Sequence, residues 1–308
     1  MGKLHISVSP HFHAPVSVQS VMRDVIIALM PATFAGVAIF GWRALAVIVF
    51  CVCSSVLAEF LFNKITKREQ SVKDLSAIIT GLLLALNLPA NVPIWQAVIG
   101  SVFAIVVVKC LFGGMGCNVV NPAITARVFM IVAFGSMTKI ALPTIVDTAS
   151  SATPLVDLAA GKSVDLMSLF LGTTGGTIGE TCVAALLLGF VYLLIRRVIT
   201  WHIPVVYIAT TYLFTLCLVG FDFTAALAWV MSGGLFIGAI FMATDYVTSP
   251  ATPLGKVVFG IGCGLITVLI RFWGNYPEGV SFAILFMNIL NPYIDKLTAR
   301  KLFGGKAA

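Results

Sequence analysis

The residues of this sequence that could carry unusual chemistry lie in one polar stretch. A D-x-x-S-x-A-T pattern interrupts an otherwise strongly apolar chain, and its polar members are Asp147, Ser150, Ser151 and Thr153. Ala152 is small enough to leave room beside the threonine, and Pro154 restricts where a following helix can begin. The hydroxyl of Thr153 is therefore a candidate for covalent attachment of a prosthetic group, with Ser150 and Ser151 as hydrogen-bonding neighbours.

Flavin mononucleotide (FMN) is a group that such a hydroxyl can hold, because its phosphate can form a phosphodiester with threonine. The acceptor must be open to a modifying enzyme, a flavin transferase, which favours a loop over a rigid helix. The tetrapeptide alone is more typical of a polar turn, or of a Ser or Thr residue that caps a short helix at Pro154, whereas the upstream Asp147, an external loop and a membrane setting favour attachment. The local sequence therefore leaves two interpretations of Thr153 open: a flavin attachment site, or a residue in a turn or helix cap.

The composition predicts a membrane protein. Of the 308 residues, 59% are apolar and only 10% are charged, whereas soluble domains carry roughly 25% charge. Apolar runs of roughly 16–20 residues recur, which is long enough to cross a bilayer core. Helices satisfy their own backbone hydrogen bonds in lipid, and the alternating pattern of barrel strands is absent from the sequence. We therefore expect an all-α, multi-pass fold.

Ten apolar segments are predicted to be transmembrane helices. They cover approximately residues 23–41, 44–62, 74–87, 94–112, 119–135, 179–196, 203–220, 224–243, 255–273 and 279–294. The third segment is short and ends at Asn87-Leu88-Pro89, which predicts a half-helix. The predicted organisation is an N-terminal segment 1–22, a five-helix repeat 23–135, an external loop 136–178, a second five-helix repeat 179–294 and a tail 295–308.

The two sets of five segments share an order of glycine, proline and basic residues. In order, Gly81, Leu88-Pro89, Lys109 and Asn121-Pro122 match Gly238, Ser249-Pro250, Arg271 and Asn291-Pro292. Because five is odd, the two copies would have opposite orientations, and inverted repeats of this kind place binding sites near the membrane midplane. Glycine and proline are also simply frequent in membrane helices, which is the alternative explanation.

Charge predicts the orientation. Most Lys and Arg residues fall on one side of the ten predicted spans, and acidic residues such as Asp147, Asp222 and Glu278 fall on the other. The positive-inside rule then places both termini in the cytoplasm and the Thr153 loop on the external or periplasmic side of the plasma (inner) membrane. The net charge of +7 comes from bases that flank apolar runs, which argues against nucleic-acid binding.

Charged residues near or inside the predicted spans are costly and therefore candidates for function. Arg127 lies about two turns into its segment, so we expect a buried partner or a bound flavin beside it. Asp245 is the candidate for an ion- or flavin-facing carboxylate. The others lie near segment ends, where long side chains can reach the interface; they are Asp24, Glu59, Lys109, Glu180 and Arg271. No catalytic group and no metal site is predicted, because the seven cysteines are scattered without metal-ligand spacing.

Longer blocks of sequence resemble a known family. The most specific are Gly113-Gly114-Met115-Gly116-Cys117-Asn118-Val119-Val120-Asn121-Pro122-Ala123 with Arg127-Val128-Phe129, Leu86-Asn87-Leu88-Pro89 and Thr244-Asp245-Tyr246-Val247-Thr248-Ser249-Pro250. With these blocks the chain resembles the D subunit of the Rnf complex, a relative of the B subunit of the sodium-pumping NADH:quinone oxidoreductase. The flavin attachment pattern of that family usually reads S/T-G-A-T, and here Ser151 replaces the glycine.

The resemblance implies a membrane electron carrier of an ion-translocating ferredoxin:NAD oxidoreductase, with covalent FMN on Thr153. It also implies iron–sulfur and NAD-binding partner subunits. The related B subunit holds a noncovalent riboflavin near the block that matches Asn118 and Asn121, and amide groups can match a flavin ring. Asn121 could instead only cap the helix that begins at Pro122. A solute transporter or channel built on inverted five-helix repeats is the alternative function, because a fold does not fix a function.

Overall fold

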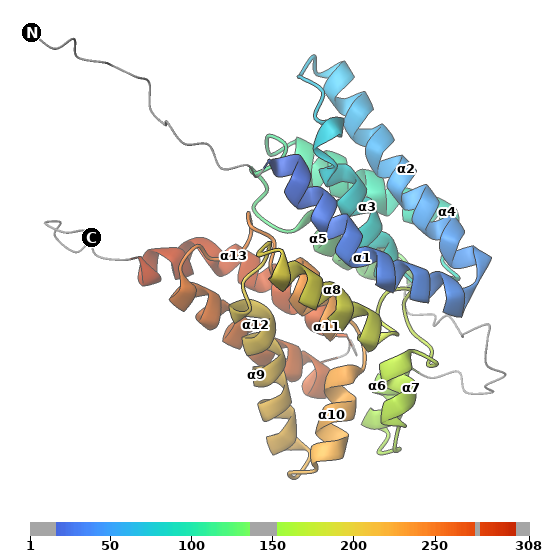
Figure 1. Ribbon diagram of the computed structural model, residues 1–308, viewed down its shortest axis with the longest axis vertical. Helices are drawn as coiled ribbons and strands as arrows, with labels where there is room; N and C mark the ends of the chain where they lie inside the picture. The colour runs from blue at the N-terminus through green and yellow to red at the C-terminus, as the bar shows by residue number, and fades with distance from the viewer. Residues whose placement is uncertain (1–16, 136–152, 275–277, 300–308) are drawn as a thin grey trace, which may run out of the picture.

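The computed structural model describes residues 17–135, 153–274 and 278–299, so Asp147, Ser150 and Ser151 lie outside the described chain. Within these ranges the protein is helical and has no strand (Figure 1). The first half contains α1 (Val18–Phe40), α2 (Trp42–Ile65), η1 (Val72–Asp74), α3 (Ser76–Leu86), α4 (Ile94–Val102), η2 (Phe103–Cys110) and α5 (Pro122–Ala133).

Two short helices separate the halves and belong to the segment that was predicted as an external loop. They are α6 (Pro154–Ala159) and α7 (Leu166–Leu171), and both pack against α10. The second half contains α8 (Val183–Ile195), α9 (His202–Leu218), α10 (Phe223–Met231), α11 (Leu235–Ile237), η4 (Gly238–Met242), α12 (Pro253–Trp273) and α13 (Val280–Thr298).

All ten predicted apolar segments are helical in the structure. The third is the short α3, which ends at Leu86 directly before Asn87-Leu88-Pro89 as predicted, since a residue that precedes proline is pushed out of helical geometry. The eighth is broken into α10 and the continuous α11–η4 segment, which meet at an angle of 66°. The glycine pair in Ser232-Gly233-Gly234 occupies this break.

By length and apolar composition, three of the described helices are each able to cross a membrane. They are α1, α2 and α12, and the bent pair α10 with α11–η4 makes a fourth if it is counted as one span. The outer faces carry large apolar side chains, among them Trp42, Leu188 and Ile195, which are 65–76% exposed. An apolar surface of this kind fits lipid contact rather than water.

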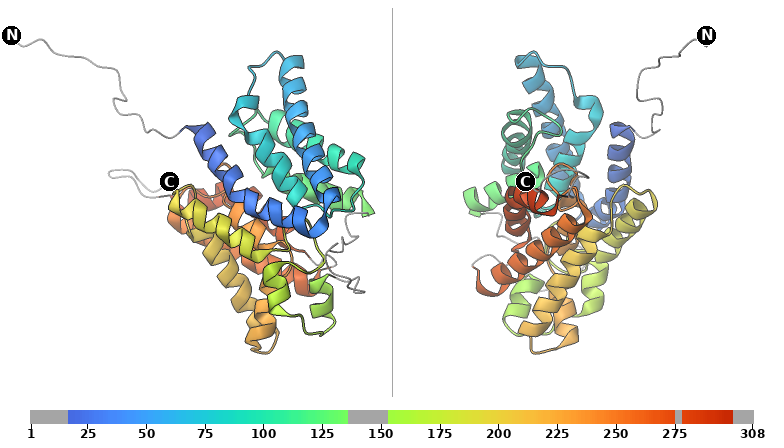
Figure 2. Two further views of the ribbon diagram at one scale, coloured as in Figure 1. Left: turned by 45° about the vertical axis from the view of Figure 1, so that its right-hand side comes forward. Right: turned by 90° about the vertical axis from the view of Figure 1, so that its left-hand side faces the viewer.

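The two halves of the chain lie side by side in all three views (Figures 1 and 2). The first helix of one half packs against the first helix of the other (α1 on α8), and the last against the last (α5 on α13). Gly189 on α8 permits the close approach to α1, because a Cβ there would lie 2.3 Å from the carbonyl oxygen of Ala28. At this point the two halves approach each other at backbone distance.

Candidate functional site

A cavity of about 460 Å³ lies where the starts of α1, α3 and α5 meet the ends of η2, α8 and η4. Its size falls within the range of pockets that hold small organic ligands, roughly 300–1,000 Å³. Most of the wall is apolar. The polar side chains on it are Ser17, Ser76, Thr80, Lys109, Asn118, Asn121, Thr244, Asp245 and Tyr246. Three residues singled out from the sequence, Asn118, Asn121 and Asp245, therefore share one cavity.

The amide of Asn121 is already engaged in holding the wall of this cavity. Its Oδ1 accepts hydrogen bonds from the backbone N–H groups of Ala123 (3.0 Å) and Ile124 (3.3 Å), which caps α5. Its Nδ2 donates to the carbonyl oxygen of Met242 at the end of η4 (3.2 Å). The capping interpretation of Asn121 is confirmed, and the residue also ties the two halves together.

Asn118 and Asp245 lie together on the cavity wall, and each has hydrogen-bond partners. The Nδ2 of Asn118 donates to the carbonyl oxygen of Val120 (3.1 Å), and the amide lies beside the carboxylate of Asp245. Asp245 follows closely on the end of η4, and its Oδ2 accepts a hydrogen bond from the hydroxyl of Thr248 (3.1 Å). No salt bridge to Asp245 occurs among the described residues. A carboxylate and an amide thus face a ligand-sized, mainly apolar space.

The single lysine on the cavity wall is neutralised by a buried partner. The Nζ of Lys109 donates to Oε2 of Glu59 (2.7 Å) and to the hydroxyl of Ser76 (2.8 Å). The side chains of Lys109 and Glu59 are only 4% and 1% exposed. The expectation that these two residues reach the membrane interface is therefore wrong, because each satisfies the other inside the protein.

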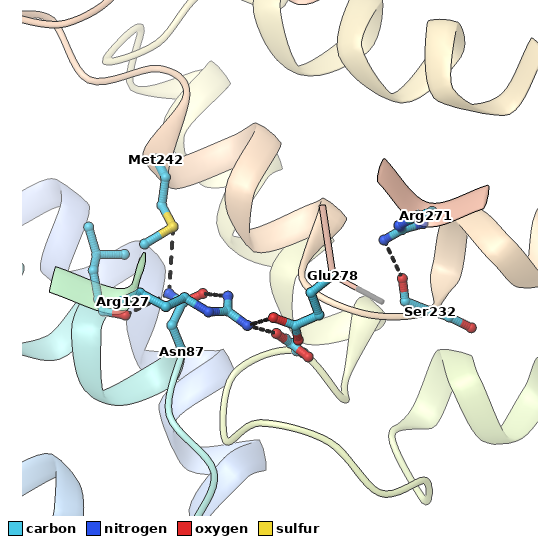
Figure 3. A network of polar contacts seen from close by, with 8 residues as sticks. Asn87, Arg127, Ser232, Met242, Arg271 and Glu278 are labelled. Atoms are coloured by element: carbon cyan, nitrogen blue, oxygen red, sulfur yellow. Dashed lines mark hydrogen bonds and ion pairs between the residues drawn. The ribbon is translucent and has the colours of Figure 1, made fainter. Parts of the chain in front are cut away.

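Arg127 lies outside this cavity, at the centre of a second polar site. Its Nη2 donates to Oε1 of Glu180 (2.8 Å) and to Oε2 of Glu278, and its Nη1 donates to Oδ1 of Asn87 (Figure 3). The prediction of a buried partner for Arg127 is confirmed. Arg127, Glu180 and Glu278 are together called the Arg127 cluster.

A second buried arginine stands near the cluster without an acidic partner among the described residues. Arg271 on α12 is 7% exposed and donates to the carbonyl oxygens of Trp229 (2.6 Å) and Ser232 (3.0 Å). These carbonyls belong to the end of α10, which has no further helical turn to bond them (Figure 3). Arg271 therefore satisfies the broken end of the span.

Thr153 caps α6, as the alternative interpretation of its sequence predicted. Its Oγ1 accepts a hydrogen bond from the backbone N–H of Val156 (3.3 Å), and Pro154 is the first residue of the helix. The side chain is half-buried and lines a small cavity. The other walls of this cavity come from the glycine-rich segment after α7, the break after α10 and the two acids of the Arg127 cluster.

Comparison with known proteins identifies the family. The model of the NQR2, RnfD, RnfE family matches residues 5–304. This chain belongs to that family. Over 307 residues it is 46% identical to the D subunit of the Na(+)-translocating ferredoxin:NAD(+) oxidoreductase complex of Acetobacterium woodii, with 98% of this chain and 95% of the relative covered.

Two further relatives of this RnfD-like chain match over a similar length. The D subunit of the proton-translocating ferredoxin:NAD(+) oxidoreductase complex of Clostridium ljungdahlii is 40% identical, with 97% of this chain and 96% of the relative covered. The D subunit of the ion-translocating oxidoreductase complex of Escherichia coli K12 is 33% identical, with 97% and 98% covered. The resemblance to the Rnf D subunit is confirmed. The relatives carry different ions in their names, so family membership does not specify the ion.

In this member of the family, a series of contacts joins the larger cavity to the Arg127 cluster. Asn121 at the cavity bonds to the carbonyl oxygen of Met242, and Nδ2 of Asn87 contacts Sδ of the same Met242 (3.5 Å). Asn87 in turn accepts from Arg127 (Figure 3). Sequence reasoning missed Asn87, Met242 and Glu278 as members of these sites. The position of Asn87 directly after a short helix was the available signal for one of them.

Proposed function

We propose that this chain is the D-type subunit of an ion-translocating ferredoxin:NAD oxidoreductase and carries electrons on a flavin attached to Thr153. Similarity over almost the full length of three D subunits supports the assignment to such a complex. This similarity favours a redox subunit over a solute transporter or channel. The partners would then include iron–sulfur and NAD-binding subunits, a flavin transferase and membrane lipid.

The observation that carries the flavin proposal is the setting of Thr153. Its hydroxyl is half-buried at a small cavity, on a residue with extended backbone geometry that precedes the helix. The facing wall includes Gly175 and Gly176, which have no side chains to obstruct a group joined to the hydroxyl. These residues leave the hydroxyl open to a phosphodiester, while the cavity of about 40 Å³ is too small to enclose the flavin ring as well. Thr153 would hold the FMN phosphate, and the bound flavin would supply one- and two-electron chemistry that the side chains lack.

The larger cavity is the proposed place for a second, noncovalent flavin, riboflavin. Its volume of about 460 Å³ and its mainly apolar wall suit a flat ring system. Asn118 and Asp245 would face the polar edge of the ring, and Asn121 would shape the wall through its cap on α5 and its bond to Met242. Asp245 also remains the candidate for an ion-path carboxylate.

We further propose ten spans arranged as two inverted five-helix repeats in the plasma (inner) membrane. The pairing of α1 with α8 and of α5 with α13 supports this arrangement, because a two-fold axis brings equivalent helices together. The bias of Lys and Arg residues supports cytoplasmic termini and an external Thr153. Under this topology the proposed covalent flavin is near the external side and the larger cavity is nearer the cytoplasmic side.

The test is to produce the chain together with an active flavin transferase and to measure its mass and in-gel fluorescence after denaturation. We expect a fluorescent band and a mass increase of one FMN, both lost in Thr153→Ala. Thr174→Ala is the matched control, because Thr174 lines the same small cavity outside the D-x-x-S-x-A-T pattern. It should retain the adduct.

Two results would contradict the proposal. An unmodified wild-type chain, with a transferase shown to be active on another substrate, would overturn the covalent flavin. An adduct that persists in Thr153→Ala would place the attachment on another residue. Free flavin released by denaturing the same samples would measure occupancy of the larger cavity independently.

A further inference from the structure

The Arg127 cluster sets two carboxylates against one guanidinium. Glu180 and Glu278 both accept from the same nitrogen, Nη2 of Arg127, so their carboxylates face each other across that atom. The side chains of Arg127 and Glu180 are 4% and 5% exposed, while that of Glu278 is 26% exposed. Two carboxylates this close cannot both stay ionised at low cost in a buried site. One negative charge added nearby raises that cost further, and one proton bound to the pair relieves it.

The surroundings offer the pair little other compensation. Among the described residues, the cations that face Glu180 and Glu278 are Arg127 from α5 and Arg271 from α12. Arg271 already bonds to two backbone carbonyls. The break after α10 and the break after α3 bring only uncharged groups, such as Gly234 and Asn87. The charge of Arg271 acts on both carboxylates, but among the described residues their only direct salt bridges are to Arg127, which they share.

The cluster is closed on one side and open on the other. A Cβ on Gly234 would lie 2.9 Å from Oε1 of Glu180 and 3.3 Å from Nη1 of Arg127, so the helix break seals that side. Glu180 and Glu278 also line the small cavity, together with Thr153. Thr181 lines it too, and its hydroxyl is buried without a hydrogen-bond partner among the described residues. An unpaired hydroxyl beside the two acids marks a place where a water molecule could deliver a proton.

We propose that Glu180 and Glu278 form a proton-binding site whose occupancy follows the charge on the group attached to Thr153. The inference rests on the proposed flavin at Thr153 and adds a role for residues that do not hold it. When one electron from the donor side of the complex reduces the group attached to Thr153, one proton from solvent would form an O–H bond on a Glu278 carboxylate oxygen. The proton returns to solvent when the electron leaves. Thr153, Glu180 and Glu278 line one cavity, so a charge on the attached group acts on the pair through a partly desolvated space, which couples the two events.

The test uses the purified, flavin-loaded complex and infrared difference spectra between its oxidised and reduced states. We expect the wild type to gain a carboxylic-acid carbonyl band on reduction, and this band should shift in D₂O. Glu278→Gln and Glu180→Gln should both lose it, because a single carboxylate paired with Arg127 needs no proton. Asp157→Asn is the matched control, since Asp157 is four residues from Thr153 but pairs with the exposed Lys162. It should keep the band.

A second readout is the midpoint potential of the Thr153 flavin as a function of pH. One proton bound per electron adds a slope of about 59 mV per tenfold change in proton concentration. We expect the wild type to show this added slope over part of the pH range and Glu278→Gln to lack it. The conservative variant Glu278→Asp should restore part of the slope.

The failure of this inference is distinguishable from the failure of the proposed flavin. If in-gel fluorescence shows FMN on Thr153 but reduction of the wild type produces no carboxylic-acid band, the proton site is overturned and the flavin assignment stands. A band that responds to Na⁺ concentration at constant pH, and not to pH, would also overturn it. If Glu278→Gln fails to assemble, the wild-type spectrum and Glu180→Gln still decide the question.

Discussion

The larger cavity and the Arg127 cluster stand on the same helix and yet are opposite in character. Asn121 at the cavity and Arg127 in the cluster are six residues apart at the start of α5 and within it, which corresponds to about 9 Å along a helix axis. The cavity is hollow, mainly apolar, and contains one carboxylate without a salt bridge among the described residues. The cluster is filled by charged side chains that bond to one another.

The difference between the cavity and the cluster follows from the helices and loops that approach each of them. Several helices begin or end at the cavity, and the glycine-rich stretch that precedes α5 leaves space between them. At the cluster, two loops insert glutamate side chains toward Arg127, and the backbone N–H groups of Ile178 and Gly179 anchor one loop to the carbonyls of Leu88 and Leu86 (3.1 and 2.7 Å). One helix, α5, can therefore border a ligand-sized space at its start and a charge cluster further along, according to the loops that approach each place.

The largest effect expected is on stability, from Arg127→Gln. This change leaves two buried carboxylates without their shared cation, which should cost about 3–5 kcal/mol of unfolding free energy. Lys162→Gln is the control, because it breaks a pair whose lysine is 70% exposed and should cost at most about 1 kcal/mol. Unfolding of both variants in a denaturant titration in detergent measures the difference. Equal losses of unfolding free energy in the two variants would show that charge pairing in the Arg127 cluster stabilises the protein no more than an exposed ion pair does.

A smaller loss of stability is expected from Gly234→Ala. The new Cβ would lie 2.9 Å from a Glu180 oxygen, so the ion pair or the helix break must shift, at a cost of about 1–3 kcal/mol. Gly135→Ala, whose Cβ would meet nothing within 4 Å, is the matched control. The same unfolding titration applies. If the Arg127 cluster and the larger cavity are energetically separate, Gly234→Ala should not change the amount of flavin held in the cavity. A loss of that flavin in Gly234→Ala would show that the two sites are coupled.

The smallest effect expected is a change in ligand binding at the cavity, from Asn118→Leu. Loss of one or two amide hydrogen bonds should weaken a noncovalent flavin by roughly tenfold, since such a bond contributes about 1 kcal/mol or slightly more. Thr244→Val is the control, because this hydroxyl lines the cavity but bonds to the carbonyl oxygen of Ile240 in the preceding turn (2.6 Å). Flavin released on denaturation measures occupancy. Retention by Asn118→Leu would remove this residue from the binding site, while covalent FMN on Thr153 should persist in both variants.

The sequence alone determined the helices and several of their ends. Apolar runs located all ten segments, Asn87-Leu88-Pro89 marked the end of α3, and Asn121-Pro122 marked the capped start of α5. Thr153 before Pro154 was recognisable as a helix cap in the same way. These features depend on backbone preferences and side-chain bonds within a few residues, so a local pattern is sufficient to predict them.

Only the tertiary structure decided which charged and polar groups meet. Glu180 and Glu278 lie 53 and 151 residues from Arg127 along the chain, and Lys109 reaches Glu59 across 50 residues. Near the ends of apolar segments such residues look like interfacial charges, and the sequence carries no local signal for their partners. Burial makes an unpaired charge too costly to tolerate, so the packing of distant segments selects the partner. That selection placed Asn118, Asn121 and Asp245 around one space and paired Arg127 with two glutamates that line the Thr153 cavity.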